Sequence, residues 1–146
     1  MKKNKIIMID RPSVDRPIGW TTLEESKELR KLGLGEGTND LWYCKSYLPD
    51  YSLQKQKITS LDIPAWSLGA LITILPPWVV VYDKEGIGHD AFFKIMNGSA
   101  WYEYFDGEKY VQTWKIVESL TIIAVIGMVK FMISHPDILE TKTAYL

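Results

Sequence analysis

The sequence predicts an α+β fold in which a four-stranded antiparallel meander packs on three helices. The dipeptides Asn97-Gly98 and Asp106-Gly107 separate alternating segments in the back half of the chain, as they do in β-hairpins. The strands follow one another without helices between them, which argues against parallel βαβ units. We expect one domain over residues 21–146, preceded by an N-terminal arm over residues 1–20.

Length and composition indicate a globular chain with a substantial core. The chain has 146 residues, of which 47% are hydrophobic and 24% charged, and its net charge is −1. This balance argues against a nucleic-acid-binding protein, which usually presents a basic face. Cys44 is the only cysteine, so the sequence offers neither an intrachain disulfide nor a cysteine-rich metal site.

The first predicted helix spans residues 23–32. Thr22 and Glu25 have the spacing of a capping box, in which each side chain accepts a hydrogen bond from the other residue's backbone amide. Gly33 is a typical residue just beyond the C-terminal end of a helix.

The segment after this helix is predicted to be mostly loop. Glycines alternate at 33, 35 and 37, but a phosphate-binding loop would need a following Lys-Ser or Lys-Thr. Residues 41–44 are expected to form a short strand, and the polar residues 45–62 a long loop.

A short buried helix is predicted over residues 66–75, between Pro64 and Pro76. Proline lacks an amide hydrogen and disfavours helical geometry in the residue before it, so Pro76 ends the helix. The apolar residues recur at helical spacing and leave little polar surface, which indicates a core element.

Three segments, residues 22–34, residues 37–43 and residues 63–76, resemble in their order a family of small uncharacterised proteins of gut anaerobes, their phages and integrated mobile elements. The resemblance covers roughly residues 20–77, and its most specific part is the segment Pro64–Leu68. It implies a phage or mobile-element origin and a location in the host cytoplasm. The family has no established activity or catalytic residues, so the resemblance assigns no site.

The back half of the chain is predicted to form the meander and the last helix. The four strands are expected at residues 78–82, 91–96, 99–105 and 108–114. The last helix is expected at 116–134 and is apolar nearly all round, so we expect it to be covered by the sheet on one side and by the 66–75 helix or a second copy on the other. Glu118 and Lys130 bound its uncharged run below the roughly 20 residues of a membrane span.

Strand alternation assigns the meander two faces. The first face is largely apolar and should meet the helices; it carries Phe93, Ile95, Ala100, Tyr102 and Val111. The second face mixes aromatic with charged and amide side chains, as binding surfaces do; it carries Phe92, Lys94, Trp101, Glu103, Tyr110, Gln112 and Trp114. The alternative is that the N-terminal arm or the 45–62 loop covers this second face.

Catalytic patterns in the sequence are weak. His89 lies near Asp83 and Glu85 and could act as a general acid–base or a metal ligand. A polar hairpin loop is the favoured interpretation, because no metal-ligand spacing supports a site. Cys44 is expected to be a structural thiol and Ser67 a helix-capping hydroxyl. The sequence therefore predicts no catalytic residues, metal or cofactor.

Our hypothesis from the sequence is a non-enzymatic binding protein that acts on a host or phage protein. The alternatives are a binder of a small ligand such as a nucleotide signal, a structural component of a phage, and a hydrolase that uses His89. We expect no nucleic-acid or membrane partner, and a homo-oligomer remains open, with the 116–134 helix as one possible contact.

Overall fold

The computed structural model describes residues 16–45 and 50–146, and these residues form two β-sheets and four helices. One sheet has the strand order β2-β1-β3, and the other has the order β7-β6-β5-β4-β8. The elements along the chain are α1 Leu23–Lys31, β1 Leu41–Lys45, β2 Tyr51–Gln54, β3 Ile63–Ala65, α2 Leu68–Ile74, β4 Trp78–Tyr82, β5 Gly88–Met96, β6 Ser99–Phe105, β7 Tyr110–Val117, α3 Thr121–Ile133, α4 Pro136–Thr141 and β8 Thr143–Tyr145.

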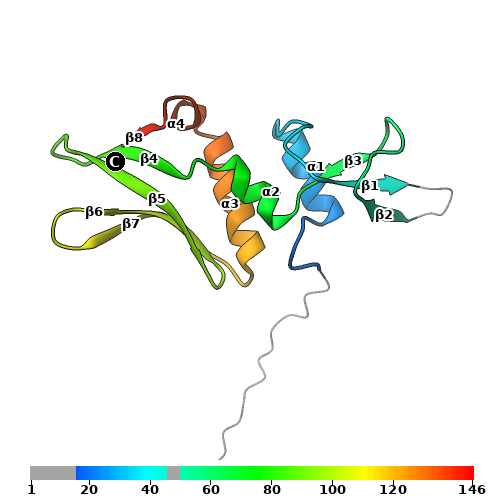
Figure 1. Cartoon of the computed structure of the whole chain (residues 1–146), viewed down its shortest axis with the longest axis horizontal. Helices are drawn as coiled ribbons and strands as arrows, with labels where there is room; N and C mark the ends of the chain where they lie inside the picture. The colour runs from blue at the N-terminus through cyan, green and yellow to red at the C-terminus, as the bar shows by residue number, and fades with distance from the viewer. Residues whose placement is uncertain (1–15, 46–49) are drawn as a thin grey trace, which may run out of the picture.

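The α+β class is confirmed, but the prediction of a single four-stranded meander on three helices is wrong. The meander β4-β5-β6-β7 is present, and β8 extends it as a parallel fifth strand beside β4. A separate sheet of three strands lies at the other end of the elongated molecule, with α2 and α3 between the two sheets (Figure 1).

The first helix forms as its local signals predict. The Thr22 hydroxyl accepts a hydrogen bond from the Glu25 amide at 3.1 Å, and the Glu25 carboxylate accepts one from the Thr22 amide at 2.9 Å. Gly33 follows the helix with φ +104°, a conformation that glycine adopts without steric cost. The capping box and the glycine stop are therefore confirmed.

The helix predicted over residues 66–75 is present but shorter, since α2 spans Leu68–Ile74 and the residues before it form a strand. Ile63–Ala65 forms β3, and α2 begins only at Leu68 because the Ser67 side chain caps it by accepting a hydrogen bond from the Ala70 amide at 3.1 Å. The 45–62 loop is also partly wrong, since Tyr51–Gln54 pairs with β1 as β2. Residues 1–15 of the predicted arm lie outside the described residues.

The hairpin signals place the meander strands close to their predicted positions. Asn97 and Gly98 have φ values of 31° and 85°, as a two-residue turn between antiparallel strands requires. The Asp106-Gly107 loop has four residues, because Phe105 pairs with Tyr110 rather than with residue 108. This shift of two residues leaves the predicted faces of Tyr110 and Val111 unchanged, since side chains alternate with a period of two.

A β-bulge in β7 changes the face of one predicted residue. Ala100 pairs with Ile116 and Tyr102 with Thr113, so Trp101 alone faces two residues, Trp114 and Lys115. The sequence analysis placed Trp114 on the binding face, but its φ of 55° turns the ring inward, 5.3 Å from the Phe131 ring of α3. The predicted face of Trp114 is therefore wrong.

The helix α3 covers the inner face of the five-stranded sheet. It begins at Thr121 rather than at 116, since residues 116 and 117 belong to β7, and every side chain along it is buried or half-buried. Its second neighbour is α2, one of the two predicted possibilities, so a dimer through α3 would find no exposed apolar face. Within the described ranges, no helix is both long and apolar enough to cross a bilayer.

Alanine substitutions at two turn glycines should separate steric exclusion from backbone strain. Gly98 and Gly107 both have positive φ, but a Cβ on Gly98 would lie 2.4 Å from the Glu118 carbonyl oxygen, whereas Gly107 has open space around it. We expect Gly107→Ala to lower the free energy of unfolding by about 1 kcal/mol, and Gly98→Ala by at least twice as much. If urea unfolding shows that both variants lose the same free energy of unfolding, the close packing of Gly98 against Glu118 would be contradicted.

Candidate functional site

The side of the five-stranded sheet that faces away from α3 is the candidate functional surface, and we call it the outer face. Across neighbouring strands Trp78 pairs with Phe92, and Phe92 pairs with Glu103. Several large side chains of this face remain in solvent, since Trp78 is 45% exposed, Phe92 49%, Phe105 51% and Tyr110 69%. Large aromatic side chains exposed together on one face of a sheet are typical of a contact surface.

Four of the seven predicted binding residues line one shallow hollow of about 540 Å³ on the outer face. These four are Lys94, Trp101, Glu103 and Gln112. Phe92 and Tyr110 are exposed on the same face, and only Trp114 is absent from it. Local strand alternation therefore placed six of the seven side chains on the face where the structure has them.

Trp101 lines this hollow and is nearly buried, although no helix covers the outer face. Its indole N–H donates a hydrogen bond to Glu103 Oε1 at 3.0 Å, and the Lys115 ammonium lies 5.0 Å from the ring centroid. These neighbours leave Trp101 only 7% exposed. Lys115 thus forms a cation–π contact with Trp101 at this hollow.

The sequence analysis missed three contributors to this face: Trp78, Phe105 and Lys115. Lys115 lay beyond the predicted end of β7, and the bulge brings it over Trp101. Phe105 alternates with Glu103 on β6 and could have been placed by the same rule. Trp78 could not, since the longer connection between β4 and β5 fixes no register from sequence.

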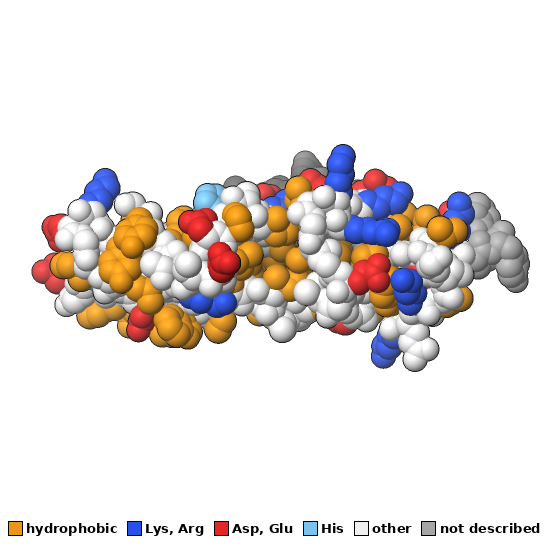
Figure 2. All heavy atoms as spheres, turned by 90° about the horizontal axis from the view of Figure 1, so that it is seen from above, with side chains coloured by type: hydrophobic (Ala, Val, Ile, Leu, Met, Phe, Trp, Pro, Cys, Tyr) orange, Lys and Arg blue, Asp and Glu red, His pale blue; other side chains and the backbone are white. Residues whose placement is uncertain are grey.

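The described part of the 45–62 segment does not cover the outer face. Residues 51–54 and 63–65 belong to the three-stranded sheet at the opposite end of the molecule (Figure 1). Seen from above, Lys and Arg side chains gather at that opposite end, while hydrophobic and acidic side chains mix at the end of the five-stranded sheet (Figure 2). On the side seen in Figure 2, the two ends therefore differ in surface chemistry.

His89 lies on the inner face of the five-stranded sheet, where it pairs with the buried Val81 of β4. Its Nε2 is 2.9 Å from Asp83 Oδ2, and its ring stacks on Tyr104 with centroids 4.5 Å apart. The hydrogen bond with His89 is the main cause that lowers the pKa of Asp83, aided by the Ile87 amide. Burial raises the pKa of the Tyr104 hydroxyl, so that group is a poor nucleophile at neutral pH.

Cys44 and Ser67 have structural surroundings. Burial is the main cause that raises the pKa of the Cys44 thiol, which keeps it protonated. Ser67 caps α2 and also hydrogen-bonds Asp40, with its amide 2.8 Å from Asp40 Oδ1. Neither residue has a neighbouring histidine among its hydrogen-bond partners in the described chain.

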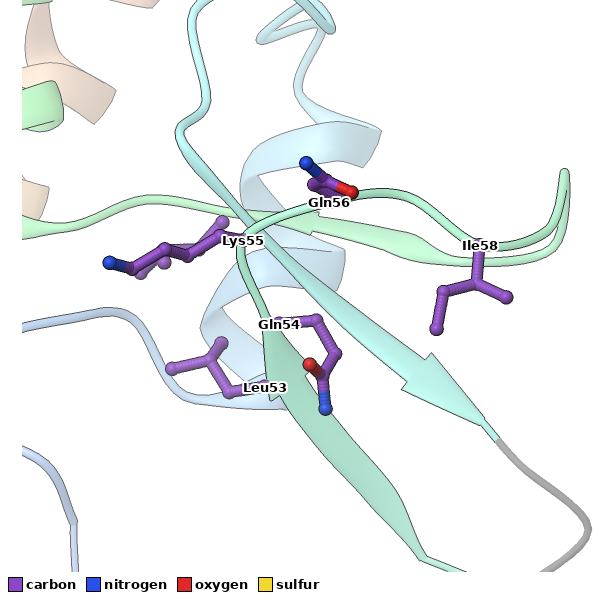
Figure 3. A pocket seen from close by; sticks show the side chains of 6 residues that line it. Leu53, Gln54, Lys55, Gln56 and Ile58 are labelled. Atoms are coloured by element: carbon purple, nitrogen blue, oxygen red, sulfur yellow. The ribbon is translucent and has the colours of Figure 1, made fainter.

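A second hollow, of about 580 Å³, lies beside the three-stranded sheet and is lined by residues of β1, β2 and the following loop. Figure 3 shows Lys55 and Gln54 pointing in different directions, so their polar ends do not converge on one point. Over residues 16–45 and 50–146, no three His, Cys, Asp or Glu side chains are grouped to hold a metal ion.

Comparisons of this chain with protein-family models, with curated proteins and with solved structures found no significant match.

The pair of Asp83 and His89 can be tested by titration. Because the pKa of Asp83 is lowered in the folded protein, ionised Asp83 stabilises the fold above its unfolded pKa of about 4, and this stabilisation is lost as the pH falls through the folded pKa. We expect His89→Ala to raise the pKa of Asp83 toward its ordinary value, as read from the carboxyl carbon by NMR. A titration curve for Asp83 unchanged by the substitution would show that the loop amides alone set its pKa.

Proposed function

We propose that this chain is a non-enzymatic protein-binding module that contacts its partner through the outer face of the five-stranded sheet. The observation that carries the proposal is the row of exposed aromatic side chains beside the polar groups around Trp101. Aromatic side chains supply contact area at low entropic cost, and the neighbouring charges and amides orient the partner.

The rigidity of the supporting sheet strengthens this proposal. The exposed residues stand on four hydrogen-bonded strands, and α3 packs behind β5, β6 and β7, where Ala100 and Tyr102 are fully buried. A surface held in this way loses little conformational freedom on binding, so more of the contact energy appears as affinity.

The nature of the partner follows from the resemblance described above. A phage or mobile-element origin would place the module in the cytoplasm of a host cell, with a host protein or a phage protein, including a structural component of the particle, as its target. This part of the proposal depends on the resemblance of residues 20–77, and the binding surface itself does not.

A small ligand bound in the hollow at Trp101 is the second candidate function. The specific observation in its favour is that Lys94 and Lys115 flank an indole ring with Glu103 and Gln112 beside it. An anionic ligand with an aromatic ring, such as a nucleotide, matches that set if it displaces Lys115 from the ring. A nucleotide that raises the melting temperature of wild type but not of Lys115→Ala would favour this candidate.

Removal of two exposed aromatic rings should weaken partner binding without unfolding the sheet. We expect the double variant Phe92→Ala/Tyr110→Ala to lose about 2 kcal/mol or more of binding free energy, about 30-fold in affinity, because both rings are largely in solvent before binding. The measurement is quantitative mass spectrometry of proteins retained from host lysate, followed by titration of the enriched protein against each variant.

The matched control is Ile58→Ala/Leu61→Ala, which removes two exposed aliphatic side chains near the three-stranded sheet. It should retain the same protein as wild type. If the control loses that protein while the Phe92/Tyr110 variant keeps it, the binding surface lies at the other end of the molecule and the proposal is wrong.

A further inference from the structure

Two charged side chains on the outer face of β5, Asp90 and Lys94, form no ion pair with any described residue. The other charges of this face are engaged within the chain, since Glu103 accepts the Trp101 indole hydrogen and Lys115 lies over the Trp101 ring. Asp90 and Lys94 are therefore the charges that this surface leaves for a partner.

The two charges are placed symmetrically about Phe92. Each lies two residues away from it on the same strand and on the same face, which is about 7 Å along the strand in either direction. Phe92 is 49% exposed and pairs across the sheet with the exposed Trp78. Along β5 the outer face thus carries a negative side chain, Asp90, then the apolar Phe92, then a positive side chain, Lys94.

We propose that the partner of the outer face is a second copy of this chain, packed face to face about a two-fold axis that passes over Phe92 of β5. This inference rests on the proposed function and names its partner, with a second copy of this chain on the outer face in place of another host or phage protein. An axis between the two sheets and perpendicular to β5 places Asp90 of each copy against Lys94 of the other, and brings the two Phe92 side chains together. The charge pattern is self-complementary under this operation.

The aromatic residues obey the same symmetry. Lys94 pairs with Trp101 across β5 and β6, and Lys115 lies beside Trp101. Phe105 and Tyr110 pair with each other on the Asp90 side of Phe92, with ring centroids 5.1 Å apart. The two-fold axis places the Trp101 and Lys115 side of one copy against the Phe105 and Tyr110 side of the other. The Lys115 ammonium of one copy then faces the exposed Tyr110 ring of the other, a favourable cation–π arrangement.

Charge-reversed variants test this arrangement directly. Asp90→Lys places two lysines opposite each other at both ends of the interface, and Lys94→Asp places two aspartates there. We expect wild type to sediment as a dimer and each variant to be a monomer at the same concentration, with a dissociation constant raised on the order of 100-fold. An equimolar mixture of the two variants should form a dimer again, because every Lys then faces an Asp.

The control is Glu140→Lys on α4, an exposed reversal of charge away from the outer face, which should remain a dimer. Recovery of the dimer in the mixture also shows that both variants are folded. Wild type that sediments as a monomer, single variants that stay dimeric, or a mixture that stays monomeric would each overturn the inference.

The failure of this inference can be told apart from failure of the proposed function. A monomeric wild type whose captured protein is lost in the Phe92/Tyr110 variant would leave the outer face as a binding surface, with a different protein as its occupant. A monomeric wild type whose captured proteins are unaffected by that variant would refute both.

Discussion

The buried indole of Trp66 and the backbone around it form the junction on which the two sheets depend. Trp66 is 0% exposed, its indole N–H donates to Thr38 Oγ1 at 3.0 Å, and its amide donates to Thr21 Oγ1 at 3.1 Å. The Thr21 amide in turn donates to the Trp66 carbonyl at 2.9 Å. Strand β3 ends just before Trp66 and α2 begins just after Ser67, so this junction sets how one half of the chain is joined to the other.

The uncovered outer face follows from where the helices pack. α2 and α3 lie between the two sheets, and α3 fills the inner face of the five-stranded sheet with seven buried residues. Glu28 of α1 and Lys130 of α3 form an ion pair of 2.7 Å that bridges the halves, an exposed contact worth little by itself. No helix in residues 16–45 and 50–146 covers the outer face, so Phe92 and Tyr110 remain exposed there.

The sequence predicted the elements that interactions between chain neighbours determine. The elements that it did not predict depend on contacts between residues far apart in the sequence. The capping box at Thr22 and the turn at Asn97-Gly98 each involve neighbours in the chain, so α1 and the β5–β6 hairpin could be predicted. The pairing of β8 with β4 joins residues more than sixty positions apart and carries no local pattern. For the candidate site, alternation placed six of seven residues, and Trp114 failed because an inserted residue in β7 reverses the face.

The bulge in β7 that turns Trp114 inward also affects whether a partner can add a strand to this sheet. β7 is an edge strand, and a bulge disrupts the regular ladder of free N–H and C=O groups that strand addition requires. The other edge, β8, is a strand of three residues, too short to template a long pairing. Both edges are therefore poorly suited to strand addition, whereas the outer face presents flat, exposed aromatic area. A partner of the five-stranded sheet gains more by stacking on that face than by extending the sheet, and this favours face-to-face packing as the mode of assembly.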